Sequence, residues 1–522
     1  MLFIRKITFS RDCHPSRHGN STSSEQYIFI PTLQRRSWKN GQKPSKHPWK
    51  SGQIVLFLPW KNGFAMLTRK IDAAIDAIYD NSKIALMLTG ARQVGKTNAF
   101  RRLAQRKFKH YVEINFIENA DAKQIFQGTQ SAKDILLRLT AFTDEPLVPG
   151  KTLILFDEVQ RCPECVTKIK FLVDEGSYRY GLTGSLLGVK LEDLKEKVHQ
   201  KDEDASEPVG YMDIKTMYPL DFEEFALAVG AAPSLIDHVR ECFDNTSPVD
   251  PVVHEQMMRI FRLYLIVGGM PAPVWKYIQT NNLQSVAIEQ LAILNLYKKD
   301  IAQYDPDKKL YLDEIFELIP SELNAKNKRF ILKELNKNLK FQKYENSFLW
   351  MKNAGVAIPV YNVEEPRIPL LLNKQRNLFK LFQNDVGLLA YQYANGIQFR
   401  ILSGEVNINY GAIYENAVAQ ELYAQGFERL YYFNSKKQGE VDFVVEIGDG
   451  TVLPIEVKSG KDYEYHHALA NILDNVEYNL NKAIILCNDN VSVDGKKTYL
   501  PIYMTTFIRK KQEIPGIYKL DI

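Results

Sequence analysis

Four charged side chains near the carboxyl-terminal end of the sequence have types and a spacing that could cleave a phosphodiester. Glu456 and Lys458 stand two residues apart in "PIEVKSG", an expected strand, so both side chains face the same side. Asp442 lies on the strand expected before it, and Glu415 on the helix before that. Carboxylate oxygens suit Mg²⁺, and a lysine can position water and stabilise charge that develops on a phosphate. The pattern predicts a metal site of Glu415, Asp442 and Glu456, with Lys458 as a catalytic residue.

The same four side chains have a second interpretation. A carboxylate and a lysine two residues apart are common on amphipathic strands, so that pair alone is a weak signal. A domain with such a core can also lose its activity and persist as a binding module, in which the charges form a salt-bridged cluster. The sequence leaves both interpretations open.

A glycine-rich loop in the first half of the sequence has the residues that hold nucleotide phosphates. "GARQVGKT" follows the apolar stretch "KIALMLT" and precedes a helix-compatible segment, and it satisfies G-x-x-x-x-G-K-[ST]. Its two glycines let backbone amides close around phosphates. Lys96 would reach the β and γ phosphates, and Thr97 offers a hydroxyl to Mg²⁺. We expect ATP to bind along the whole loop: Gly90, Ala91, Arg92, Gln93, Val94, Gly95, Lys96 and Thr97.

A second apolar strand supplies the acidic residues that ATP hydrolysis requires. "KTLILFDEVQ" ends with Asp157 and Glu158. Asp157 would hold Mg²⁺ through water, and Glu158 would orient or deprotonate the attacking water, so Glu158 and Lys96 are predicted to be catalytic. A further expected strand, "YRYGLTGS", brings Thr183 or Ser185 to a position where a hydroxyl senses phosphate in an additional-strand P-loop ATPase.

The elements that must position these residues follow from the order of apolar segments. Strands that alternate with helices after residue 66 predict a parallel sheet with helices on both faces and phosphate at the carboxyl ends of the strands. Around Glu415 and Lys458 we expect a helix, three strands, a helix and a strand. This is the element order of a restriction-endonuclease-like core.

Five stretches carry a resemblance to a known family: "LTGARQVGKT", "LFDEVQRCPECVTKIKFLVDE", "LTGSLLGVK", "YPLDFEEFALAVG" and "YLIVGGMPAPV". Their order resembles a bacterial and archaeal AAA-type P-loop ATPase family with a C-terminal domain of unknown function. That domain in turn resembles a PD-(D/E)xK nuclease. The resemblance implies an AAA-type core, a helical lid, and a contact between residues 268–271 and adenine. It does not decide which arginine completes the site among Arg92, Arg161, Arg179 and Arg262.

The middle of the chain, residues 306–400, predicts three short helices followed by two strands, an order that suits a winged helix. It contains the densest basic run outside the amino-terminal region. That run is either a DNA-facing helix or a solvated face. Its members are Lys326, Lys328, Arg329, Lys333, Lys337, Lys340 and Lys343.

Composition limits the classes of protein that fit. Of the 522 residues, 45% are apolar and 25% charged, which is ordinary for a soluble protein, and no stretch approaches the roughly 18 apolar residues of a membrane helix. Residues 1–65 hold 11 basic and 2 acidic side chains, which leaves 56 basic and 60 acidic for the rest. Because the remainder is nearly neutral, any nucleic-acid site must be a local patch. We expect residues 1–65 to be a disordered extension, with the natural product beginning at Met66.

The sequence has an odd number of cysteines and no recognisable signal peptide, which indicates a protein of the reducing cytoplasm. The five cysteines are Cys13, Cys162, Cys165, Cys242 and Cys487. Cys162 and Cys165 form a C-x-x-C, but no second pair or histidine cluster follows it, so we expect a structural role.

The resulting prediction is an α/β protein with an AAA-type ATPase core (66–225), a helical lid (226–305), a winged-helix-like module (306–400) and a nuclease-like domain (401–522). It would hydrolyse ATP with Mg²⁺ and couple this to a magnesium-dependent nuclease or DNA-binding domain. The alternatives are a signalling or switch ATPase whose nuclease-like domain only binds a partner, and a remodelling ATPase that acts as an oligomeric ring. No membrane association is expected.

Overall fold

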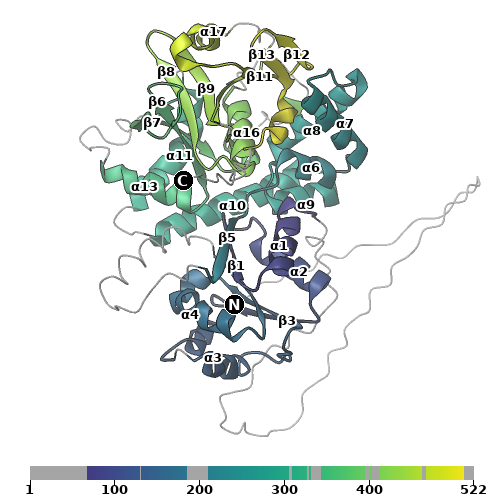
Figure 1. Ribbon diagram of the computed structural model, residues 1–522, viewed down its shortest axis with the longest axis vertical. Helices are drawn as coiled ribbons and strands as arrows, with labels where there is room; N and C mark the ends of the chain where they lie inside the picture. Colours follow the sequence, from purple (N-terminus) through teal and green to yellow (C-terminus); the bar gives the residue numbers. More distant parts are fainter. Residues whose placement is uncertain are drawn as a thin grey trace, which may run out of the picture. The chain divides into compact units, whose positions relative to one another are not determined.

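The computed structural model describes two β-sheets and the helices around them (Figure 1). The described residues are 67–129, 131–184, 210–304, 309–325, 328–330, 342–393, 400–402, 411–448, 450–460 and 466–510. Among them, no helix is long and apolar enough to cross a membrane.

The first sheet has five parallel strands, in the order β2 (His110–Asn115), β3 (Thr152–Asp157), β4 (Arg179–Thr183), β1 (Ala85–Thr89) and β5 (Met212–Thr216). Strand β3 is buried along its whole length, as expected for a parallel strand covered on both faces. Because β4 lies between β1 and β3, the residues at the ends of these three strands are neighbours. The predicted parallel sheet is confirmed.

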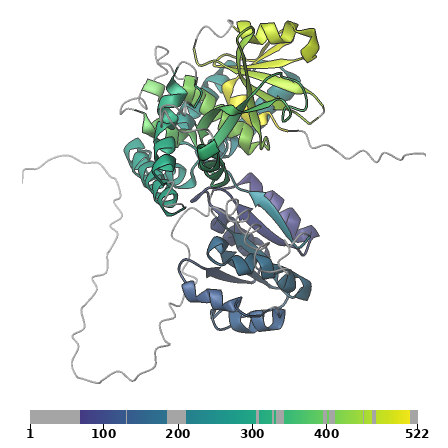
Figure 2. The same ribbon diagram turned by 90° about the vertical axis from the view of Figure 1, so that its left-hand side faces the viewer.

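Helices cover both faces of this sheet, as Figure 2 also shows. On one face, α1 (Lys70–Asn81) and α2 (Lys96–Lys107) share a core with Leu86 of β1 and Leu155 of β3. On the other, α3 (Ala132–Leu139) and α4 (Pro163–Glu175) pack with Ile154 and Phe156 of β3. Alternate residues of β3 therefore serve two separate cores.

A helical region follows the first sheet. It contains α6 (Phe222–Ala228), α7 (Pro233–Asn245), α8 (Pro251–Val267), α9 (Pro271–Thr280), α10 (Leu283–Tyr304), α11 (Lys309–Asn324) and α13 (Gln342–Asn353). Helix α6 begins with a capping box between Asp221 and Glu224, and α7, α8 and α9 each begin with proline, which suits the first turn because it lacks an amide hydrogen.

The second sheet has eight strands, both parallel and antiparallel. Their order is β12 (Ser492–Asp494), β13 (Lys497–Pro501), β11 (Ala483–Cys487), β10 (Val452–Val457), β9 (Gly439–Glu446), β8 (Leu430–Ser435), β6 (Ala357–Val363) and β7 (Lys374–Gln383). Helix α16 (Gly411–Ala424) packs in the core on one face, and α17 (His467–Asp474) in the core on the other. The order α16, β8, β9, β10, α17, β11 is the element order predicted for this part of the chain.

The strands expected in a winged-helix-like module belong instead to this second sheet. β6 and β7 pair antiparallel, as a wing would, but β6 also pairs in parallel with β8. The physical reason lies in burial, because β6 is buried along nearly its whole length, as expected for a strand inside a sheet and not for an exposed wing. The prediction of a separate winged-helix-like module is therefore wrong for these strands, and β7 becomes an edge of the C-terminal sheet.

Candidate functional sites

The loop between β1 and α2 has the backbone conformation of a phosphate-binding loop. Gly90 and Gly95 have φ angles of 123° and 102°, and Gln93 has a φ of 63°. A Cβ at Gly90 would collide with the carbonyl oxygen of Met217, so only glycine fits there. Helix α2 begins at Lys96, so the unpaired amides of its first turn lie next to the loop.

Lys96 lies inside this loop. Its Nζ donates to the carbonyl oxygens of Gly90 at 3.0 Å and Ala91 at 2.8 Å. Burial lowers the pKa of Lys96 to about 8, although the carboxylates of Glu158 and Asp157 act in the opposite direction. The amine is thus held where the resemblance places a phosphate-binding group.

The residues predicted to hold Mg²⁺ meet at the end of β3. Thr97 Oγ1 donates to Asp157 Oδ1 at 3.0 Å, and Thr183 Oγ1 at the end of β4 donates to the same oxygen. Burial raises the pKa of Asp157, whereas the hydrogen bond from Thr183 lowers it. Asn115 Nδ2 of β2 donates to Asp157 Oδ2 at 3.0 Å, a contact that sequence reasoning missed. Hydroxyl and carboxylate oxygens together form a donor set that fits Mg²⁺.

Glu158 follows directly after this strand in an unusual conformation. Its φ of 60° and ψ of 45° are left-handed, which is uncommon for a residue with a side chain. The backbone amide of Glu158 donates to Thr183 Oγ1 at 3.3 Å, and its carboxylate accepts from Gln160 Nε2. The strand ends thereby bring Glu158, Asp157 and Thr183 together. Ser185, the other predicted hydroxyl, lies outside the described residues.

Of the four arginines considered for this site, Arg92 lies in the phosphate-binding loop itself and forms an ion pair with Asp300. Its Nη1 donates to Asp300 Oδ1 of α10 at 2.5 Å. Residues 268–271 also lie next to the loop, because a Cβ at Gly95 would be 3.8 Å from Pro271 Cγ.

The C-x-x-C pair is buried in the core beside α4. Burial raises the pKa of the Cys162 thiol to about 11 and that of Cys165 well above its usual range. Protonated, buried thiols are poor metal ligands and poor nucleophiles. The environment of the pair is that of core residues.

The carboxylates predicted in the C-terminal part converge from three elements. Glu415 comes from α16, Asp442 from β9 and Glu456 from β10. Burial, followed by repulsion from Asp442, raises the pKa of both Glu415 and Glu456, the latter to about 8. The Val457 amide donates to Asp442 Oδ2 at 2.9 Å, and Lys458 Nζ contacts Glu456 Oε1 at 2.9 Å. The four predicted side chains thus form one electrostatic cluster.

Two lysines that were not assigned to this site lie among these carboxylates. Lys380 of β7 is fully buried, and its Nζ lies 2.8 Å from Glu440 Oε1, 3.5 Å from Glu415 Oε2 and 3.8 Å from Asp442 Oδ1. Lys328, from the basic run, also pairs with Glu415. Burial alone would lower the pKa of Lys380, but the surrounding carboxylates raise it, so the amine remains charged.

Sequence features could have assigned both Lys380 and Glu440 to this cluster. Lys380 stands within "LFKLFQ", where a charge on a strand of large apolar residues requires buried acidic partners. Glu440 stands two residues before Asp442, on the same face of β9.

In this arrangement the carboxylates of the cluster have lysine partners. Within the described ranges, no group of three or more His, Cys, Asp or Glu side chains is placed to hold a metal ion. Glu415 is paired with two ammonium groups, so its oxygens already have cationic partners. The predicted metal set of Glu415, Asp442 and Glu456 is brought together, but lysines supply the positive charge.

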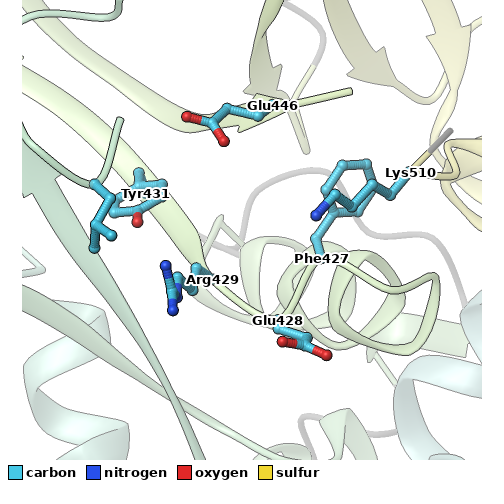
Figure 3. Close-up of a pocket in the computed structure, with 7 residues that line it drawn as sticks. Phe427, Glu428, Arg429, Tyr431, Glu446 and Lys510 are labelled. Carbon is cyan, nitrogen blue, oxygen red and sulfur yellow. The ribbon is translucent and has the colours of Figure 1, made fainter. Parts of the chain in front are cut away.

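Two cavities are present in the described part of the chain, and one of them borders the phosphate-binding loop. One, of about 280 Å³, is lined by Arg429, Lys510, Glu428, Glu446, Leu371, Phe427 and Tyr431, as Figure 3 shows in part. It contains none of the predicted site residues. The other, of about 260 Å³, includes Gly90 and Ala91 at the start of the phosphate-binding loop and residues of the second sheet, among them Ala357 and Ile358.

Comparison with family models divides the chain into three matched regions. Residues 82–226 match an AAA domain. Residues 258–398 match a domain of unknown function, DUF8612, and residues 410–505 match another, DUF4143. The chain thus carries an AAA-type P-loop ATPase domain followed by two domains of unknown function. No curated protein matches this sequence.

Several solved structures are similar to this chain. The Walker-type ATPase paby2304 of Pyrococcus abyssi is 12% identical, with 62% of this chain and 95% of that chain covered and a TM-score of 0.37. The ORC2 protein of Aeropyrum pernix in its ADP form is 13% identical, with 66% and 95% covered and a TM-score of 0.26. The RuvB Holliday junction branch migration motor of Thermotoga maritima is 15% identical, with 58% and 88% covered and a TM-score of 0.25.

Proposed function

We propose that this chain binds and hydrolyses ATP at the loop of residues 90–97. The observation that carries the proposal is the meeting of Thr97, Asp157 and Thr183 at the ends of neighbouring parallel strands, with Lys96 inside the loop. The match to an AAA domain supports it independently.

Each residue would have a defined role. The loop amides and Lys96 would bind the phosphates, and Thr97 and Asp157 would hold Mg²⁺, which would neutralise charge that develops on the phosphate oxygens. Glu158 would orient and deprotonate the attacking water, and Thr183 would fix the backbone of Glu158 through the amide hydrogen bond. Residues 268–271, beside Gly95, would contact the adenine.

The test is phosphate release from ATP by the full chain in the presence of Mg²⁺, measured together with ATP binding. Binding with phosphate release would support the proposal. A chain that binds ATP without any release would contradict hydrolysis, and a chain that binds no ATP would contradict the whole assignment.

ATP affinity should depend on pH because of Lys96. Its pKa of about 8 means that the amine is charged below that pH, and phosphate favours the charged form. Affinity should therefore be constant below pH 8 and fall as the pH rises above it, by roughly tenfold for loss of a charged hydrogen bond of about 1.5 kcal/mol. Titration with a fluorescent ATP analogue on both sides of pH 8 measures this. A flat profile, with circular dichroism unchanged, would contradict the role of Lys96.

For the C-terminal sheet we propose a binding module rather than a magnesium-dependent nuclease. The contacts that favour this are the two ion pairs of Glu415 with Lys328 and Lys380. A nuclease site needs carboxylates that are free to bind metal, whereas these are neutralised by the protein itself. The chain would then act as a switch ATPase whose second sheet recognises a partner.

Accordingly, single- and double-stranded DNA should remain intact when incubated with the full chain and Mg²⁺, with or without ATP. Gel electrophoresis of wild-type chain beside Asp442→Asn and Lys458→Ala separates this site from contaminating nucleases. Cleavage by the wild-type chain that both variants lose would overturn the binding-module proposal and support the nuclease.

A further inference from the structure

Asp300 connects the phosphate-binding loop to a helix outside the AAA domain. It lies on α10, at a position matched by DUF8612, and its Oδ1 accepts from Arg92 Nη1 at 2.5 Å. Asp300 is 8% exposed and the Arg92 side chain 33% exposed, so this contact is partly shielded from solvent. A shielded ion pair with a guanidinium is strong, but it is costly to leave either charge without a partner.

Besides its ion pair with Arg92, Asp300 is close enough to other charges of the proposed ATP site to act on them. Its charge interacts with those of Glu158 and Arg161 as well as with Arg92, and it also acts on Lys96. Burial raises the pKa of Asp300, and Arg92 opposes that rise. A carboxylate in this position would repel a bound γ phosphate and compete with it for Arg92.

Helix α10 in turn contacts the second sheet. Tyr297, three residues before Asp300 and fully buried, accepts a hydrogen bond at 3.1 Å from Asn384 Nδ2, directly after β7. The same strand carries Lys380 of the C-terminal cluster. A shift of α10 would therefore act on the strand that neutralises Glu415.

We propose that Asp300 is a positioning residue that senses the nucleotide. Without ATP it holds Arg92 and ties the loop to α10. The triphosphate of ATP competes for the guanidinium, because arginine can bind phosphate through two parallel hydrogen bonds. ATP binding therefore separates Arg92 from Asp300 and releases α10 from the loop. This inference rests on the proposed ATP site and adds its link to the second sheet.

Asp300→Asn in the full chain tests the exchange, because it removes the charge and keeps the volume. ATP should bind roughly tenfold more tightly than to wild type, within the 5–150-fold range typical of coupled sites, and ADP affinity should change less because it lacks the γ phosphate. Competition with a fluorescent ATP analogue measures both. A purely structural role would change the affinities for ATP and ADP equally.

The matched control is Glu317→Gln on α11, which removes the ion pair between Glu317 and Lys298 of α10. Its nucleotide affinities should equal those of wild type. A second readout needs no variant: amide hydrogen exchange in residues 283–304 of wild type should be faster with ATP than with ADP, and Asp300→Asn should abolish this difference.

Two results would overturn the role of Asp300 even in a chain that hydrolyses ATP. One is that Asp300→Asn binds both ATP and ADP with the affinities of wild type. The other is that hydrogen exchange in α10 of wild type is the same with ATP as with ADP. A wild-type chain that binds no nucleotide would overturn the ATP site itself and the inference with it.

Discussion

Replacing Glu158 with Gln should lower kcat for ATP hydrolysis by roughly 10²–10⁴-fold, the usual contribution of a general base. Gln has nearly the same volume but cannot accept a proton from water. Its backbone would keep the hydrogen bond to Thr183, so the left-handed conformation at this position should persist. ATP affinity should remain close to wild type, because the proposed phosphate contacts come from Lys96 and the loop amides and not from Glu158. Single-turnover phosphate release and equilibrium binding of ATP separate these two effects.

Glu164→Gln is the matched control for this variant. It removes the same charge six residues later, on the first turn of α4 and exposed to solvent. Its kcat should stay within a factor of about two of wild type, as expected for a surface change away from the site. If Glu158→Gln hydrolyses ATP as fast as the control, Glu158 is not the base.

The geometry of the candidate ATP site was predictable because its residues lie in continuous segments. Residues 90–97 form one loop, and Asp157 and Thr183 each end an apolar strand, so a parallel sheet places them together without further information. Asp300 gave no such signal. It reaches Arg92 across 208 residues of sequence, and one carboxylate on a long amphipathic helix looks like any solvated charge.

The C-terminal site was predicted in part, for a related reason. Glu415, Asp442, Glu456 and Lys458 belong to consecutive elements, so their element order was sufficient to bring them together. Lys380 reaches the cluster only because β6 pairs in parallel with β8 and carries β7 into the sheet. This pairing depends on packing between distant segments, and the assumption of a separate winged-helix-like module concealed it.

Replacing Lys380 with Met should destabilise the chain by about 3–5 kcal/mol, the usual cost of leaving a buried charge without its partner. Met fills nearly the same volume, so packing is retained while Glu415, Glu440 and Asp442 lose their shared cation. Lys328 would still pair with Glu415, but it cannot replace an amine that contacts three carboxylates. Denaturant unfolding of wild type and variant measures the difference.

The loss of stability caused by Lys380→Met should be smaller at acidic pH than at neutral pH. Burial and Asp442 already raise the pKa of Glu415, and removal of Lys380 would raise it further. A carboxyl group whose pKa is higher in the folded chain than in the unfolded chain stabilises the fold at low pH and loses that contribution as the pH rises. Lys482→Met, which removes an exposed lysine near β11, should change stability by less than about 0.5 kcal/mol at either pH.

Lys380→Met also distinguishes a cluster neutralised by lysine from a metal site. If Lys380 supplies the charge that Mg²⁺ would otherwise provide, millimolar Mg²⁺ should leave the unfolding midpoint of wild type unchanged and raise that of Lys380→Met, because a ligand that binds only the folded chain stabilises it. Stabilisation of wild type by Mg²⁺ that Asp442→Asn removes would show instead that the carboxylates bind metal with Lys380 present. In that case the two ion pairs of Glu415 would not decide the chemistry of this sheet, and the nuclease hypothesis would regain its support.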